Sequence, residues 1–597
     1  MTPSQIRKFF LSSVFVVLGV AGSVAQTESQ KPPQTDDKTT ARIVSPLDKA
    51  VDIDAKAVYS PSNLNRVGVQ QAQPLPMTLN EAIRRALENN NDIEVSRDDV
   101  RFQDTQVRSL EGQYDPVLTL SPNFTRNSTT GSTATKDFRV NSNFSQFIRK
   151  GGGSYQAFFN NTRTENQFAQ AQVTSGNVST GNSAIFSSSL GFNYTQPLAR
   201  NLRIDSRRHS IIVAKKRLEQ TDTDFRLRAT ETITAVSRAY WDFVFTLRNQ
   251  QNQVANVNLA RENLRQIEAK IDAGAAAPLE KAEVATELAN REGDLLLATQ
   301  QVGIAENTLK QLVLKDPLSF EWQQTFVPTD RPAFSLDTVN LDDAMKDAMD
   351  NRFELRRLKL QKEINDTDIK LFKNLIKPQI DLNTTFSLDG LSRGGATTST
   401  TFVNGFTGNE EILRTRLNTL LLPANQIGQY LVAIPGTPSF LAGGFNRSLA
   451  NIFRSDAPNY SIGVTFSFPF RNRTAKANLA GAEIQRNQLD AQTRGQEQTI
   501  IVDVRNAVQA VETTRQRVLT ARRARENAEI QLDGERKLYE AGKSTTFILF
   551  QRENGLTNAR NAEIRAETDY NKAVADLQRV TSTAFRANNI QLASPLK

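Results

Sequence analysis

The sequence has no cysteine and a single histidine, His209, among its 597 residues. Without cysteine, the chain cannot form disulfides, thiolate zinc sites or iron–sulfur clusters, and it has no cysteine nucleophile. One histidine leaves little scope for a histidine metal site or acid–base pair. Gly151-Gly152-Gly153 also lacks the lysine and following helix of a phosphate-binding loop. We therefore expect no cofactor and no enzymatic activity.

Long apolar runs are absent, apart from one short stretch at the N-terminus. Arg7 and Lys8 precede the apolar segment Phe9 to Val20, and the small residues Ser23-Val24-Ala25 follow. This order is typical of a cleaved secretory signal peptide. The alternative, an N-terminal membrane anchor, is disfavoured because about twelve apolar residues are too few to span a bilayer. Without a cysteine at the cleavage site, a lipid-anchored N-terminus is also excluded.

Charge of one sign does not dominate, because 73 Lys and Arg stand against 64 Asp and Glu. The net charge of +9 is spread along the chain. Arg515, Arg517 and Arg522 form the densest basic cluster, but they recur at helical spacing beside Glu526 and Glu529. Such a pattern is typical of a solvated helix face, so we expect no nucleic-acid partner.

The chain repeats itself. A shift of 262 residues aligns Leu79, Ala82 and Ala86 with Leu341, Ala344 and Ala348, and a shift of 268 aligns Ala273-Gly274 with Ala541-Gly542. Order and spacing are kept without close identity, which indicates a tandem duplication of about 240 residues per copy.

Each copy opens with a helix that begins at a capping sequence, Thr78-x-x-Glu81 or the looser Asn340-x-x-Asp343. These helices are expected to stop before Pro116 and Pro378, because a residue that precedes proline is disfavoured in helical geometry. The prolines are thus helix-to-strand entries.

Alternation with period two follows in both copies. Ile380, Leu382 and Phe386 share one face of a strand, and Asp381 and Asn383 share the other. More than half of the 33 phenylalanines lie in these two regions. The pattern predicts strands with one apolar and one polar face, as in a soluble sandwich or in a membrane barrel.

The long helices separate these two possibilities. From about Arg203 to Asp272 there is no proline or glycine, and apolar residues recur in steps of three, four or seven, which predicts a helix roughly 105 Å long. A second such helix ends at Glu540. Each stops at a glycine, Gly274 or Gly542, and a shorter helix returns.

The predicted segments are a signal peptide at 1–25, a flexible lead-in at 26–73, repeat 1 at 74–316 (helix 79–113, strands 116–198, long helix 203–273, return helix 278–314), a linker at 317–338, repeat 2 at 339–583 (helix 341–376, strands 379–470 with a long external loop 391–458, long helix 474–541, return helix 545–582) and a tail at 584–597.

One copy of the chain cannot bury these surfaces. Four apolar-faced strands cannot close a barrel, and a helical hairpin with one apolar seam needs a partner. A cyclic homo-oligomer satisfies both requirements. The predicted fold is mixed α and β: an oligomeric outer-membrane β-barrel continued by a long helical cylinder.

This arrangement resembles the TolC family of outer-membrane efflux ducts. The resemblance rests on Leu79-x-x-Ala82-x-x-x-Ala86-Leu87-x-Asn89 in the opening helix, on Gln196-Pro197-Leu198 and Phe468-Pro469-Phe470 as strand-to-helix exits, and on Tyr539-Glu540-Ala541-Gly542 as a hairpin tip. It covers residues 75 to 583, nearly the whole mature chain.

The resemblance implies a homotrimer with a twelve-stranded barrel in the lipid of the outer membrane of a Gram-negative-type bacterium. A twelve-helix tunnel would extend into the periplasm, to a periplasmic adaptor and an inner-membrane transporter. It implies that the adaptor docks at Gly274 and Gly542 and that Tyr539 lies near the closed entrance. From the residues alone, both glycines are equally consistent with plain helix stops. The cargo is not specified.

The sequence departs from the family pattern at two places. Acidic residues that ring the entrance in better-known members are replaced by Ile548 and Gln551, so Glu280 and Glu283 are our candidates for that ring, with a solvated helix face as the alternative. The segment 136–163 reads as an inserted hairpin, which could project outward or add two barrel strands. Outside the family, a surface coiled-coil protein without a channel is the main alternative; it would have no use for the strands.

Overall fold

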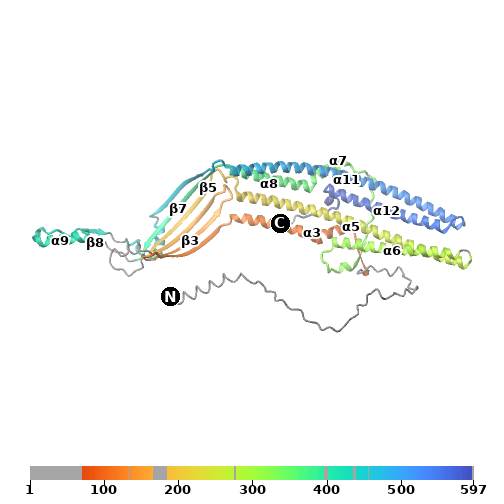
Figure 1. The fold of residues 1–597 in the computed structure, drawn as a ribbon, viewed down its shortest axis with the longest axis horizontal. Coiled ribbons are helices and arrows are strands. Elements are labelled where there is room, and N and C mark those ends of the chain that lie inside the picture. The colour runs from red at the N-terminus through yellow and green to blue at the C-terminus, as the bar shows by residue number, and fades with distance from the viewer. Residues whose placement is uncertain are drawn as a thin grey trace, which may run out of the picture. The chain divides into compact units, whose positions relative to one another are not determined.

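The computed structural model describes residues 70–131, 134–165, 184–274, 277–394, 401–434, 438–454 and 456–593. The chain divides into two units, 1–63 and 64–597, and every described residue belongs to the second. Within this unit the long strands gather at one end and the long helices at the other (Figure 1). The predicted signal peptide and nearly all of the predicted lead-in lie outside the described residues.

The main sheet has six antiparallel strands in the order β10-β7-β5-β4-β3-β2. The resemblance implied four strands per chain, and whether the inserted hairpin adds two more was left open; the sheet of one chain has six. The extra two are the inserted hairpin, which pairs along its whole length between β2 and β5. The strands are β2 (Val117–Asn127), β3 (Thr135–Phe147), β4 (Ser154–Glu165), β5 (Ile185–Pro197), β7 (Gln379–Arg393) and β10 (Pro458–Ser467).

The two faces of the sheet differ in polarity across all six strands. The register places Leu120, Ser142, Phe159, Leu190 and Leu388 side by side on one face. The opposite face carries mainly Thr, Ser, Asn, Gln and Asp. Because side chains alternate along a strand, an unbroken register keeps the two faces separate from edge to edge.

Phe158 is one of the few large apolar side chains on the polar face, and it lies over Gly191 of the neighbouring strand. A Cβ built on Gly191 would approach Phe158 Cζ to 2.3 Å and the Phe386 carbonyl oxygen to 2.7 Å. A glycine is therefore needed where the β4 aromatic ring covers β5.

Substituting Gly191 by alanine tests that contact. We expect Gly191→Ala to lower stability by about 1–3 kcal/mol, as overpacking does, and to lower the thermal midpoint of the detergent-extracted protein. Gly463→Ala on β10 is the matched control, because nothing lies within 4 Å of its Cβ position. Adding Phe158→Ala should relieve part of the Gly191→Ala defect. Equal midpoints for Gly191→Ala and Gly463→Ala would contradict the packing of β4 on β5.

Each opening helix is two helices rather than one. The predicted helix 79–113 divides into α2 (Leu79–Asn89) and α3 (Asn91–Glu111), and the predicted helix 341–376 divides into α7 (Leu341–Asn351) and α8 (Phe353–Leu375). At the first break, the side chain of Asn90 leaves the helix path and accepts hydrogen bonds from the amides of Asp92 and Ile93, which caps α3.

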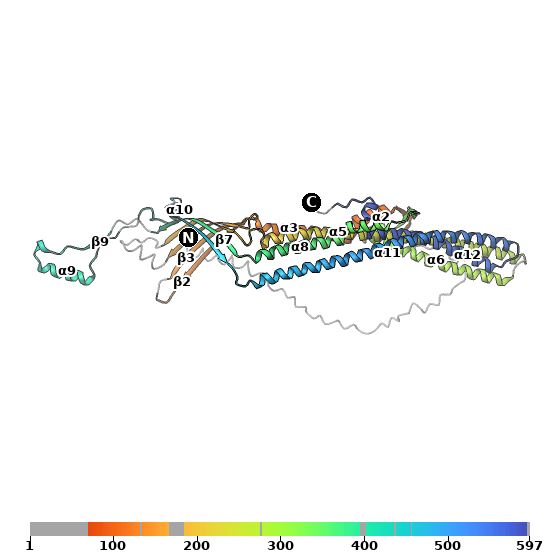
Figure 2. The same ribbon diagram turned by 90° about the horizontal axis from the view of Figure 1, so that it is seen from above.

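The long helices are continuous. They are α5 (Ser206–Asp272) and α11 (Arg473–Glu540), and the return helices are α6 (Pro278–Val313) and α12 (Thr546–Val580). Figure 2 shows the two hairpins running together to the end of the unit that lies away from the sheet. Neither long helix contains proline, so no backbone donor is lost within it.

A small layer covers the middle of α5. It combines α2 with the parallel strands β1 (Gln70–Met77) and β6 (Gln324–Pro328), and it buries Ile83, Tyr240 and Phe326. Two segments that were predicted to be a linker and a tail belong to this buried layer. Strand β6 lies in the predicted linker 317–338. Helix α13 (Ala584–Ala587) lies in the predicted tail, and its Ala584 is buried.

The predicted external loop 391–458 contains regular structure within its described residues. Its elements are β8 (Thr401–Asn404), α9 (Gly408–Leu420), β9 (Leu431–Ile434) and α10 (Phe445–Phe453). Helix α10 packs on the apolar face of the sheet at the end away from the long helices, where Ser448 Oγ lies 2.7 Å from Ser188 Oγ. Gly390 of β7 lies beneath the same helix.

Among the described helices, none combines the length and apolarity that a membrane crossing requires.

Candidate functional site

The tips of the two helical hairpins have the same geometry. Gly274 and Gly542 follow the ends of α5 and α11 with φ of +73° and +71°, the left-handed region that favours glycine. Their amides donate to the carbonyl oxygens of Ile271 and Tyr539, at 2.9 and 3.0 Å. Nothing lies within 4 Å of either Cβ position. Each glycine is thus a helix stop on a free surface.

Tyr539 joins the tips of the two repeats. Lys270 Nζ donates to the Tyr539 hydroxyl at 3.2 Å and lies 4.6 Å from the centre of its ring. Glu280 is half-buried and Glu283 is exposed at the start of α6, and neither carboxylate has an ion-pair partner among the described residues. Both therefore keep their charge available close to the tip.

A buried ion pair, which sequence reasoning missed, links the hairpins farther from the tips. Arg291 of α6 and Glu553 of α12 have side chains 5% and 3% exposed, with 3.3 Å between Nη2 and Oε2. Arg291 also bonds Glu287, and Asn263 of α5 donates to Glu553. Burial raises the pKa of Glu553, and the charge of Arg291 opposes that rise.

The contact between α5 and α12 is largely polar. Asn252 donates to Asn561 at 2.8 Å, and Thr557 donates to Asn256 at 3.0 Å. Charged pairs extend the same line toward the sheet, as in Lys572 with Asp242 at 2.6 Å. We call this line, from Asp242 to Glu553, the polar seam. A partly exposed pair such as Lys572 with Asp242 contributes little net stability, whereas the seam ends at the buried pair of Arg291 and Glu553.

The four prolines lie where strands meet helices. Pro116 and Pro378 immediately precede β2 and β7, Pro197 is the last residue of β5, and Pro469 follows β10 by two residues. His209 lies near the same junction, where its Nε2 is 2.6 Å from Asp368 Oδ1. It therefore ties α5 to α8.

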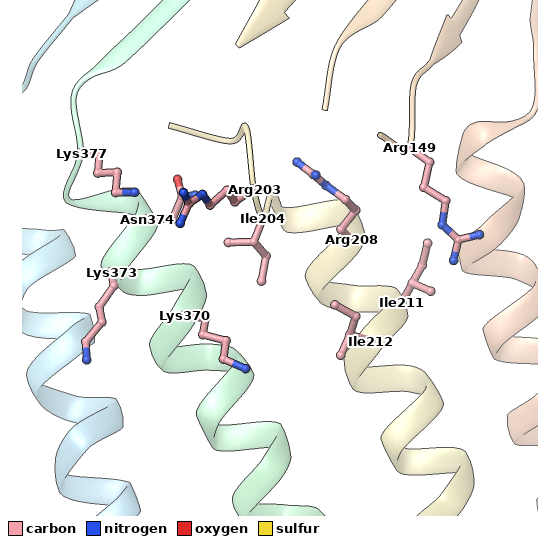
Figure 3. A pocket seen from close by; sticks show the side chains of 10 residues that line it. All are labelled: Arg149, Arg203, Ile204, Arg208, Ile211, Ile212, Lys370, Lys373, Asn374 and Lys377. Carbon is pink, nitrogen blue, oxygen red and sulfur yellow. The ribbon is translucent and has the colours of Figure 1, made fainter. Parts of the chain in front are cut away.

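A basic cleft of 640 Å³ opens between the start of α5 and the end of α8. Figure 3 shows Lys370 and Lys373 on α8, with Lys377 just past its end, and three isoleucines at or just before the start of α5; the side chain of Lys373 points away from the isoleucines. No carboxylate lines it; the lining residues are Arg149, Arg203, Ile204, Arg208, Ile211, Ile212, Lys370, Lys373, Asn374 and Lys377. Arg208 pairs with Asp205, but Arg203 and the three lysines have no ion-pair partner among the described residues.

In the described part of the chain, no group of three or more His, Asp or Glu side chains could hold a metal ion. The features described above are exposed tips, a polar seam, a two-faced sheet and a basic cleft.

Comparisons with known proteins agree with these features. The sequence profile of a family described as "Outer membrane efflux protein" matches residues 82–313 and 438–583, more than half of the chain. No curated protein sequence matches the chain at a significant level.

Several solved structures share the fold. A membrane protein from Pseudomonas aeruginosa aligns with a TM-score of 0.55 at 16% identity, covering 84% of this chain and 90% of that chain. The Campylobacter jejuni CmeC outer membrane channel aligns with a TM-score of 0.54 at 14% identity, covering 86% and 90%. The outer membrane protein VceC from Vibrio cholerae aligns with a TM-score of 0.53 at 13% identity, covering 84% and 95%. At these identities the likeness shows the fold alone.

Proposed function

Because the chain belongs to the outer membrane efflux protein family, we propose that it is the exit duct of a tripartite efflux or type I secretion system. Three copies would form a passive channel, with the sheet in the outer membrane and the helices in the periplasm. An inner-membrane transporter would supply the energy, and a periplasmic adaptor would connect it to the duct.

The observation that carries this proposal is the sheet with two unlike faces, whose strands join directly to four helices, two of them the long helices α5 and α11. An apolar face suits lipid, and a polar face suits a water-filled lumen. Both edge strands, β2 and β10, are exposed along their whole length. A long exposed edge of this kind requires a partner, and a ring of identical copies supplies one.

The tips are the proposed adaptor-docking surface. Gly274 and Gly542 have no side chain, and nothing lies within 4 Å of their Cβ positions, so an adaptor hairpin could approach their backbone closely. Tyr539 would lie at the entrance with Lys270. The polar seam would be the line along which the hairpins move apart when the duct opens.

Negative-stain electron microscopy of protein extracted from outer membranes in mild detergent tests the duct. We expect a threefold tube on the order of 100 Å long, as helices of 67 and 68 residues require, with a detergent belt near one end. A compact particle, or a solid rod without a belt, would contradict the proposal.

Glu280 and Glu283 are proposed to form an acidic ring at the entrance. We expect Glu280→Gln combined with Glu283→Gln to lower the cation-to-anion permeability ratio in planar bilayers several-fold, because neutral side chains no longer attract cations. The paired change Glu262→Gln with Glu292→Gln is the control, since those carboxylates already bond Arg265 and Arg261. An unchanged ratio in the first variant would exclude the ring.

A further inference from the structure

The inserted hairpin is a full part of the sheet. Strand β3 pairs with β4 from Lys136↔Glu165 to Phe147↔Ser154, and β4 pairs with β5 from Ser154↔Thr195 to Thr164↔Ile185. The pairing leaves no room for β2 to contact β5. Both hairpin strands continue the apolar face of their neighbours, with Phe138, Phe144 and Phe159 on the same side as Leu120.

The turn of the hairpin docks at the strand–helix junction. Gly151 and Gly152 adopt φ of +81° and +68°, and a Cβ on Gly152 would lie 2.5 Å from the Asn201 carbonyl oxygen. Gln196 Nε2 donates to the Gly151 carbonyl oxygen at 2.9 Å. The hairpin therefore turns against the start of α5, which excludes an outward projection.

The two edge strands of the sheet, β2 and β10, have the directions and lengths needed to pair with each other between neighbouring copies. Strand β2 follows α3 and runs away from the helices, whereas β10 runs back toward α11. A β2 strand placed beside β10 of the next copy would thus be antiparallel, like every other pair in the sheet. The two edges have 11 and 10 residues, so they can pair along nearly their whole length.

We propose that three copies close an eighteen-stranded barrel; this rests on the trimeric duct proposed above. With strands about 4.8 Å apart and tilted by about 40°, eighteen strands give a backbone diameter of about 36 Å, against about 24 Å for twelve. Six such strands span about 38 Å of circumference, and four helices at 8–10 Å spacing span about 32–40 Å. The barrel would continue the helical tunnel at nearly constant width.

A bore of this size places the exit in the range of water-filled porins rather than of side-chain-filled small barrels. The outer-membrane segment would therefore not sort cargo by size. It suits wide, hydrated cargo such as an extended polypeptide or polysaccharide chain, and selection would fall to the periplasmic end.

Cysteine pairs test the strand order directly, because the natural chain has no cysteine. Gln156→Cys with Asn193→Cys places two thiols opposite each other on β4 and β5, within the Cα separation that a disulfide allows. We expect oxidation, or a short bifunctional thiol reagent, to link them within one chain. Thr119→Cys with Asn193→Cys is the control; two strands separate these residues in this sheet, whereas β2 and β5 would be adjacent strands in a twelve-stranded barrel.

The inter-copy edge needs its own pair. Thr119→Cys combined in turn with cysteine at Gly463, Thr465 or Ser467 should give a covalent trimer for at least one combination. Suppose that an inter-copy pair gives a covalent trimer, but that within one chain Asn193→Cys links to Thr119→Cys and not to Gln156→Cys. This result would overturn the eighteen strands and keep the duct. A protein with no inter-copy link and no trimer by electron microscopy would overturn the duct itself.

The basic cleft carries a second, independent inference. Its lining residues Arg149, Arg203 and Lys377 lie between β3 and β4, between β5 and α5, and between α8 and β7, respectively. The cleft therefore lies at the level where strands give way to helices (Figure 3).

We infer that this cleft binds the phosphate of an anionic phospholipid in the inner leaflet of the outer membrane. Lys370, Lys373 and Lys377 lack ion-pair partners among the described residues and would surround the headgroup with Arg203. The three isoleucines would contact the start of its acyl chains. Basic side chains around an apolar floor provide both interactions that a lipid at the interface requires.

Native mass spectrometry from nanodiscs of equal phosphatidylglycerol and phosphatidylcholine tests this site on the full-length protein. We expect retained phosphatidylglycerol to fall several-fold in Lys370→Gln/Lys373→Gln/Lys377→Gln and to stay unchanged in the matched control Lys346→Gln/Lys359→Gln/Lys543→Gln. Equal retention in all three proteins would overturn the inference. Saturation of the cleft by millimolar inorganic phosphate, with loss of the lipid preference, would reduce it to a general anion site.

Discussion

Replacing Lys310 with methionine is expected to destabilise the protein strongly, because it breaks a fully buried ion pair. Lys310 and Glu306 on α6 have side chains 0% and 1% exposed, with 3.3 Å between Nζ and Oε1. Lys310 also donates to the carbonyl oxygens of Trp322 and Gln324, and Glu306 accepts from the Phe326 amide. The pair therefore holds the segment that enters β6 against α6.

The expected cost of Lys310→Met is about 3–5 kcal/mol, because the change leaves a buried carboxylate without its cation. Chemical unfolding followed by circular dichroism would measure it as a lower midpoint. Lys315→Met is the control, since its pair with Glu94 is exposed and should contribute at most about 1 kcal/mol. Adding Glu306→Gln to Lys310→Met should restore much of the loss. Equal shifts for Lys310→Met and Lys315→Met would refute the buried pair.

Removing Arg291 is the second change with a large expected effect, and this effect depends on pH. In Arg291→Met the Glu553 carboxylate loses its buried cation, which we expect to cost about 3–5 kcal/mol. The defect should loosen α6 from α12 and raise the conductance of the resting channel in bilayers. Arg261→Met is the control, because its pair with Glu292 is more exposed.

The sign of the pH dependence follows from the pKa of Glu553. Burial raises that pKa above 4.5, and loss of Arg291 removes the main opposing charge, so the pKa should rise further. A carboxyl with a raised folded-state pKa destabilises the fold as pH rises from its unfolded pKa through its folded pKa. The Arg291→Met defect should be full above the folded pKa and should shrink toward pH 4.5. Arg291→Met/Glu553→Gln should lack this pH dependence; a defect that does not vary with pH would argue against an ionised Glu553.

The sequence was informative where a pattern is local. Period-two alternation located the strands, and the absence of proline and glycine located the long helices. The resemblance to the efflux family is confirmed by the profile match over residues 82–313 and 438–583. The same reasoning could not place the inserted hairpin, because a projecting hairpin and one within the sheet have the same alternation. Pairing partners decide the difference, and strand pairing is not local.

Other features were missed for comparable reasons. Strands β1 and β6 are about 250 residues apart in the chain, and the prolines at 74 and 76 favour a loop rather than a strand at β1. The breaks at Asn90 and Arg352 contain neither proline nor glycine, although Asn89-Asn90-Asn91 was an available capping signal. The Arg291–Glu553 pair joins two repeats, and no spacing rule connects residues 262 positions apart. The roles proposed for Gly274, Gly542, Glu280 and Glu283 stay predictions.

The hairpin formed by β3 and β4 shows how such a sheet can widen without disturbing its surroundings. A hairpin leaves the sheet's path and returns to it at the same end, so β5 still enters α5 as it would without the insertion. A single added strand would reverse every later element and direct the helices to the opposite side. The number of strands in this architecture can therefore change only by two at a time. The outer part of the protein can then vary in evolution while the helical part keeps its connections.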